Sequence, residues 1–138
     1  SKTATPASDP VNGTTNPKLI PGAILAYTFA VSNTGPRAVD VNTVWLIDTL
    51  PSNLLVGTAA SPVFAQGTPT SSLTFSAATD IAYSSAASRP ASFAACNYTP
   101  TTSYEPNVHY VCLNPKGSMA ASTGTPPNFT LTIKAQVK

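Results

Sequence analysis

The side chains of this sequence that could take part in chemistry include a single histidine, His109. Any mechanism in which a histidine activates a nucleophile would have to use it. In an alternating strand, His109 and Val111 face away from Cys112, and a histidine on the solvent face accounts for that position. No Gly-rich phosphate loop or nucleophile motif accompanies it, so we predict no catalytic residue and no enzymatic activity.

Five acidic residues are the candidates for acid–base chemistry or metal binding. They are Asp9, Asp40, Asp48, Asp80 and Glu105. They lie far apart in the sequence, without paired spacing for acid–base work and without the loop pattern of an EF-hand. Each lies beside a turn or a strand end, where a carboxylate can accept backbone hydrogen bonds. We therefore predict no metal and no cofactor, with a calcium site assembled from loops as the alternative.

The only two cysteines of the chain are Cys96 and Cys112. In an exported protein such a pair is read as one disulfide, which contributes about 3 kcal/mol of stability for a loop of this size. Two buried thiols, or a metal site, are the alternatives. Zinc is the less favoured of these, because the chain has no Cys-x-x-Cys spacing and only one histidine.

Trp45 is the one tryptophan, and its ring could stack on a sugar. Its neighbours Val44, Leu46 and Ile47 form a continuous apolar run, which burial on both faces of a strand would explain. We therefore expect Trp45 in the core. Binding of host or cell-surface glycans through this ring is the alternative.

Composition describes a weakly charged chain that is long enough for one domain with one core. Hydrophobic residues make up 42% of it, and charged residues only 9%, compared with about 25% in typical soluble proteins. The net charge of +2 is small, and the basic residues form no cluster, so we predict no nucleic-acid partner. The small charge also opposes association between copies only weakly.

The expected location follows from two features of the chain. No apolar run approaches the roughly 20 residues of a membrane-spanning helix, so we predict no membrane span. The chain begins at Ser1 without methionine, as it would after removal of an export signal. We expect a mature secreted protein, extracellular or on the cell surface.

The 14 prolines leave little room for helices, because proline removes a backbone donor and clashes with the preceding helical turn. Short alternating segments between them predict an all-β fold, an antiparallel sandwich of about seven to ten strands. The expected strands are residues 23–32, 39–48, 54–56, 63–65, 73–77, 81–83, 93–98, 107–113 and 129–138. The segments 93–98 and 107–113 would form a pair that carries the two cysteines.

The N-terminal half also carries a set of motifs in a fixed order. They are Asp9-Pro10-Val11-Asn12-Gly13, Pro17-Lys18-Leu19-Ile20-Pro21-Gly22-Ala23, Tyr27 with Asn33 and Gly35, and Asp48-Thr49-Leu50-Pro51. This set resembles the DUF11 conserved repeat domain of bacterial and archaeal surface proteins. The resemblance implies an immunoglobulin-like β-sandwich that is secreted or displayed on the cell surface, and it implies no catalytic residues.

Residues 1–11 precede most of this resemblance and form an extended N-terminal arm, followed by a single domain at 12–138. An extended arm can add a strand to the sheet edge of a neighbouring copy, and repeated head to tail this contact grows a filament. The residues assigned to such a subunit contact are Lys2, Thr3, Ala4, Thr5, Pro6 and Ala7. We therefore predict a structural homopolymer. In the alternative, the arm is an edge strand of its own domain and the protein is a monomeric adhesive or spacer module.

Overall fold

The larger of the two β-sheets is built around the C-terminal strand β9 (Asn128–Val137), in a computed structural model that describes residues 1–138. The five strands of its main path run in the order β1 (Lys2–Ser8), β2 (Ile24–Ser32), β9, β4 (Leu54–Gly57) and β7 (Tyr104–Glu105). A sixth strand, β5 (Val63–Gln66), also pairs with β9, beyond the part that β4 occupies. All of these pairings are antiparallel.

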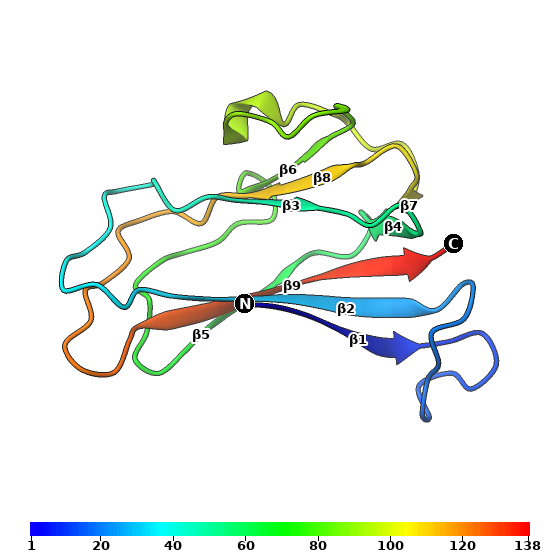
Figure 1. Cartoon of the computed structure of the whole chain (residues 1–138), viewed down its shortest axis with the longest axis horizontal. Coiled ribbons are helices and arrows are strands. Elements are labelled where there is room, and N and C mark those ends of the chain that lie inside the picture. Colours follow the sequence, from blue (N-terminus) through cyan, green and yellow to red (C-terminus); the bar gives the residue numbers. More distant parts are fainter.

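The smaller sheet has three antiparallel strands and lies over the larger one (Figure 1). Its central strand is β8 (Tyr110–Leu113), between β3 (Leu46–Thr49) and β6 (Ile81–Ser84). The predicted all-β fold is therefore confirmed as two antiparallel sheets with nine strands, and its likeness to an immunoglobulin domain stays a prediction.

The core lies between the two sheets and comes from the alternation of β2 and β9, as predicted. These strands pair in continuous register, so that Phe29 lies opposite Leu131 and Tyr27 opposite Ile133. All four side chains are buried, together with Phe129 of β9 and other apolar residues of one 15-member cluster. The intervening residues, such as Thr28 and Thr132, lie on the other face, where their hydroxyl groups are 2.8 Å apart.

Four of the predicted strands are wrong in whole or in part. Of the segment 107–113, only residues 110–113 are a strand. Only residues 46–48 of the segment 39–48 belong to a strand, because a turn that places Asn42 at φ 62° precedes β3. Residues 73–77 form no strand and make only an isolated bridge from Thr74 to Lys116. Residues 93–98 contain a short 3-10 helix, η1 (Phe93–Ala95), so the cysteines do not lie on paired strands.

The disulfide between Cys96 and Cys112 is present, as predicted. Cys112 belongs to β8, and Cys96 directly follows η1 in the long segment between β6 and β7. This segment covers the side of the smaller sheet that faces away from the larger one (Figure 1). Tyr110 is buried beside the disulfide, and Phe93 packs against the same cluster. Strand β8 is therefore buried on both of its faces.

Candidate functional site

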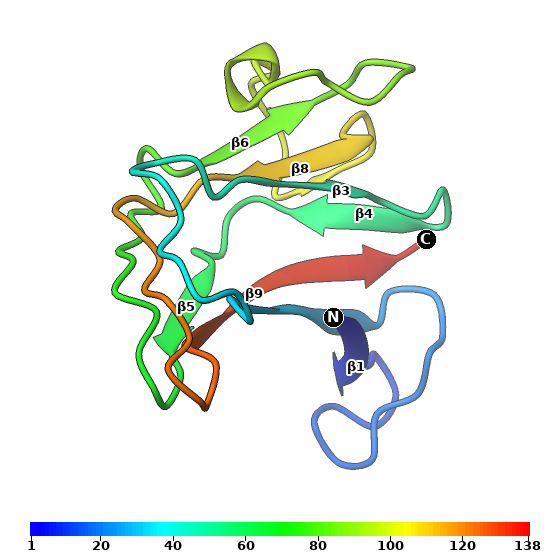
Figure 2. The same cartoon turned by 60° about the vertical axis from the view of Figure 1, so that its left-hand side comes forward.

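The residues predicted to contact a neighbouring copy form strand β1, which pairs with β2 of its own domain. It lies at the border of the larger sheet (Figures 1 and 2). Lys2, Thr3, Ala4, Thr5 and Ala7 are exposed, and only Pro6 is half-buried. The strand therefore contributes almost no apolar side-chain area to the core.

The two edges of β1 differ. Ser1 and Ala30 exchange both backbone hydrogen bonds, of 2.8 and 3.0 Å. Because bonded and non-bonded pairs alternate in an antiparallel ladder, Thr3 and Thr5 also turn their backbone groups toward β2. Those of Ala4 and Pro6 point outward, where proline has no N–H to offer. The register also shifts between Pro6 and Ser8, and such devices commonly protect a free sheet edge.

One side chain of β1 makes a strong contact. The Nζ of Lys2 lies 2.7 Å from Oδ1 of Asp48 in β3 and 5.1 Å from the ring centroid of Tyr27. The Asp48 side chain is only 13% exposed. Lys2 therefore joins the edge of the larger sheet to the edge of the smaller one across the open side of the sandwich.

An apolar groove lies next to this contact. It has a volume of about 270 Å³, and Ala4 of β1 lines it together with Leu25, Tyr27 and Leu54 of the domain. The exposed Leu19 forms part of its rim. Because Ala4 has only a methyl group, β1 does not fill the groove. The docking of β1 therefore depends on backbone hydrogen bonds and on Lys2.

The loop that joins β1 to β2 is held in one conformation by Asp9. Its carboxylate is buried and accepts hydrogen bonds from the backbone N–H groups of Val11 (2.7 Å), Asn12 (2.6 Å) and Lys18 (2.5 Å). The bond from Asn12 is the main reason that the pKa of Asp9 lies far below its usual range. Asp9 thus holds the loop in a defined conformation that leads the chain from β1 back to β2 of the same domain.

Gly22 is required where this loop meets β2. Its φ is +84°, and a Cβ atom at this position would lie 2.9 Å from Cγ of Pro10. We expect Gly22→Ala to lower the free energy of unfolding by about 1–2 kcal/mol for the left-handed backbone alone, with the clash added. Gly13→Ala is the control, since Gly13 has φ +60° with no atom within 4 Å. Urea unfolding of both variants measures the difference; equal losses would mean that the Pro10 contact has no effect.

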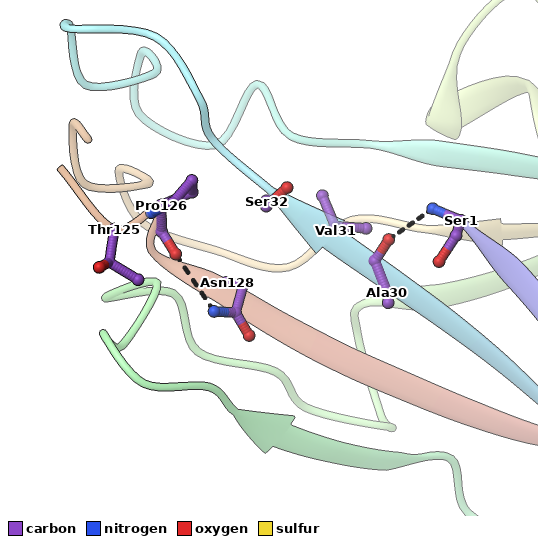
Figure 3. Close-up of a pocket in the computed structure, with 7 residues that line it drawn as sticks. All are labelled: Ser1, Ala30, Val31, Ser32, Thr125, Pro126 and Asn128. Carbon is purple, nitrogen blue, oxygen red and sulfur yellow. Dashed lines mark hydrogen bonds between the residues drawn. The ribbon is translucent and has the colours of Figure 1, made fainter.

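A second, open depression of about 500 Å³ lies where β1 begins (Figure 3). Ser1 bonds Ala30, and β2 continues beyond this pair to Ser32, while Pro126 and Asn128 form the opposite side. The amide of Asn128 donates to the Pro126 carbonyl at 3.2 Å. No acid, histidine or cysteine lines the depression.

His109 is exposed, as predicted, and its Nδ1 lies 3.0 Å from the carbonyl oxygen of Ala86. Val111, predicted to share its solvent face, is instead completely buried in the core, since both faces of β8 are covered. Among the acids, Asp9, Asp80 and Glu105 accept backbone hydrogen bonds, as predicted.

The expectation that Trp45 belongs to the core is wrong, because 41% of the residue is exposed. It precedes β3, in the part of the predicted strand that is not a strand. Val41 in the same segment is 67% exposed. Apolar residues, Trp45 among them, therefore lie partly at the surface here.

Glu105 is a buried carboxylate that the structure satisfies with backbone groups. Thr101 N–H donates to it at 2.9 Å and Asn107 N–H at 3.2 Å. Chiefly through the bond from Thr101, its pKa falls from 4.5 to about 2. Because the folded protein holds the ionised form, this stabilisation is complete above pH 4.5 and is lost as the pH falls toward 2.

We therefore expect the urea midpoint of the parent protein to fall more steeply between pH 4.5 and pH 2 than that of Glu105→Gln. The variant is less stable at neutral pH, but it has no carboxylate to protonate at this position. Asp40→Asn is the matched control, because Asp40 is exposed. Parallel acid dependence in the parent and in Glu105→Gln would contradict this role.

Sequence reasoning named Lys2 but missed its partner Asp48, which lies 46 positions away. Asp48 was expected to accept backbone hydrogen bonds at a strand end, whereas it lies within β3 and pairs with the ammonium group. The available signal was an acid directly after the apolar run 44–47. A charge in such a place needs a partner.

The structure and the comparisons with known proteins add three negative findings. No three side chains among its histidine, cysteine, aspartate and glutamate residues are grouped so that they could hold a metal ion. No helix is long and apolar enough to cross a membrane. In comparisons with known proteins, no family model, no curated protein and no solved structure matches this chain.

Proposed function

We propose that the protein is a non-enzymatic subunit of an extracellular filament, in which β1 of one copy pairs with β2 of the next. The supporting observation is that β1 docks through one backbone edge, with exposed side chains and no large apolar anchor. Such a strand can be exchanged between copies without exposing a core residue of its own. An exchange that passes from copy to copy does not close on itself, and it grows a filament.

The low charge and the disulfide fit this proposal. A net charge of +2 with 9% charged residues opposes close packing of copies only weakly. Disulfides persist outside the reducing cytosol, which agrees with a secreted protein. The resemblance of residues 9–51 to DUF11 surface domains supports the same location and the absence of an active site.

The closed monomer and the filament use the same contacts between β1 and β2. Their balance is therefore set by the linking loop and by protein concentration. In the monomer the arm is tethered beside its own acceptor edge, which gives it a high effective concentration. Pairing between copies competes with the closed monomer when the free protein concentration approaches this effective concentration. We therefore expect filaments to grow only above a threshold concentration.

Electron microscopy of the purified protein over a range of concentrations tests this proposal. We expect fibres above a threshold, and only folded monomers at every concentration after deletion of residues 1–9. A synthetic peptide of residues 1–8 should bind the deletion variant, because the variant has an open β2 edge. If the intact chain stays a monomer at all concentrations, or if the deletion variant still makes fibres, the proposal is wrong.

A monomeric adhesive module is the second candidate, and the exposed Trp45 favours it. An aromatic face at the surface can stack on a sugar ring. In this case a glycan array would show binding by the parent protein, and Trp45→Ala would lose it with an unchanged circular dichroism spectrum. Phe129→Ala is not a suitable control, because Phe129 is part of the core. Val63→Ala is suitable, since Val63 is also an exposed apolar residue at 64%.

A further inference from the structure

The contact of Lys2 has two properties that matter for an exchanged strand. It is the only β1 side chain with a hydrogen bond or an ion pair. Its partner Asp48 depends on it, because Oδ2 of Asp48 is buried without a hydrogen-bond partner and Oδ1 bonds only the Lys2 ammonium. The acceptor site formed by Asp48 and Tyr27, called the lysine seat below, is thus a negatively charged position that β1 must supply with a cation.

The lysine seat also fixes the register of β1. Lys2 pairs with Phe29 and shares its face, which is the face directed toward the smaller sheet. A slip of one residue would turn this side chain to the outer face. A slip of two residues would move it by about 6.8 Å along the strand, beyond the reach of Asp48. Pro6 also opposes a slip of one residue, because its nitrogen has no hydrogen to give to β2, but among the β1 side chains only Lys2 makes a hydrogen bond or ion pair that a slip of two residues would break.

We infer that Lys2 of one copy occupies the lysine seat of the next copy, and that this ion pair selects both the partner and the register of the exchanged strand. The inference rests on the filament proposed above. The partner that fits the seat is a second copy of this chain, because a β1 strand with Lys2 at this register already occupies it in the closed monomer.

A charge exchange between two variants tests the inference. Lys2→Glu places an acid against its own Asp48, and Asp48→Lys places a cation against its own Lys2. Each variant alone therefore repels its arm, both within the molecule and between copies. When the two are mixed, every contact between unlike molecules joins opposite charges, whereas every contact within one molecule stays repulsive.

We expect each variant alone to form few fibres, and the equimolar mixture to form at least tenfold more, at a lower threshold concentration than the parent. The combined variant Lys2→Glu/Asp48→Lys should behave as the parent does. Since the gain on mixing can arise only between molecules, folding defects cannot imitate it. If either variant alone forms fibres as well as the parent does, or if mixing gives no gain, the lysine seat does not select the partner.

A second measurement uses unaltered protein, in case Asp48→Lys does not fold. Fibres grown from a mixture of 15N-labelled and unlabelled copies are treated with a carbodiimide, which joins an amine and a carboxylate in direct contact. Amide links between Lys2 of one isotope and Asp48 of the other support the inference. Links only within one isotope would overturn it while leaving the filament intact. Absence of fibres in the parent protein would instead overturn the proposed function.

Discussion

Thr3→Pro is expected to weaken the docking of β1 and to reduce fibre growth, whereas Ala4→Pro should leave both the docked strand and the fibres intact. The two positions are neighbours, are both exposed and belong to the same strand. They differ in the direction of the backbone N–H, since Thr3 turns it toward Thr28 and Ala4 turns it toward solvent. Pro6 lies in the same orientation as Ala4, so the natural sequence already tolerates proline on the outer edge.

The loss in Thr3→Pro has a calculable size. The carbonyl oxygen of Thr28 would lose its donor, at a cost of about 1–3 kcal/mol, which corresponds to roughly 5-fold to 150-fold weaker docking. Because the same ladder holds the closed and the exchanged strand, both states lose relative to an undocked arm. The free-energy difference between the closed and the exchanged state is therefore unchanged, and the population of the monomer with an undocked arm increases.

Amide hydrogen exchange measures this directly. The N–H groups of Thr28 and Ala30, which point toward β1, should exchange faster by that factor in Thr3→Pro and at the parental rate in Ala4→Pro. Electron microscopy gives the effect on fibres. Equal behaviour of the two variants would show that β1 is not held through its inner edge, and the proposed exchange would lose its basis.

The parts of the fold that could be predicted are those whose pattern is local. In β9, Phe129, Leu131 and Ile133 alternate with Thr130 and Thr132, and this alternation alone defines the strand and its buried face. Strand β2 shows the same pattern, and together the two strands supply much of the core. The disulfide was also predictable, because two cysteines allow only one pair.

The failures arise from contacts between distant residues. The turn at Asn42 is held by Asn114, whose amide donates to the carbonyl oxygens of Asn42 and Val44 at 3.2 and 2.8 Å. Gly117 N–H donates in turn to the Asn42 side chain. No local propensity of residues 39–45 contains this information. The same reason applies to the lysine seat, where Lys2 and Asp48 meet only after two sheets have packed together.

The pairing partner of β1 was only partly predictable from the sequence. Its small residues could not show whether it would pair with its own domain or with another copy, because the ladder has the same geometry in both. The structure shows the closed form, with the arm on its own β2. What the sequence did contain was the asymmetry of the strand, since Pro6 removes one outward donor and leaves the inner edge complete.

Removal of the disulfide by Cys96→Ala/Cys112→Ala is expected to lower the free energy of unfolding by about 3 kcal/mol. The crosslink closes a loop with a sequence separation of 16 and thereby restricts the unfolded chain. In the folded protein it fixes the segment after β6 to the outer face of β8. The remaining local connections are few, such as the bond from Tyr98 N–H to the carbonyl of Tyr83 at 2.9 Å.

Urea unfolding with and without a reductant measures this contribution. The parent protein should fall to the midpoint of the double variant when it is reduced, while the double variant should not respond to the reductant. Hydrogen exchange should show where the effect begins: Tyr98 N–H loses protection first, and the amides of β2 and β9 follow only in global unfolding. Fibre growth should persist in the double variant wherever it is folded, because Cys112 and β1 lie on different sheets. An unchanged midpoint on reduction would mean that packing of Phe93 and Tyr110, and not the covalent bond, holds this outer layer.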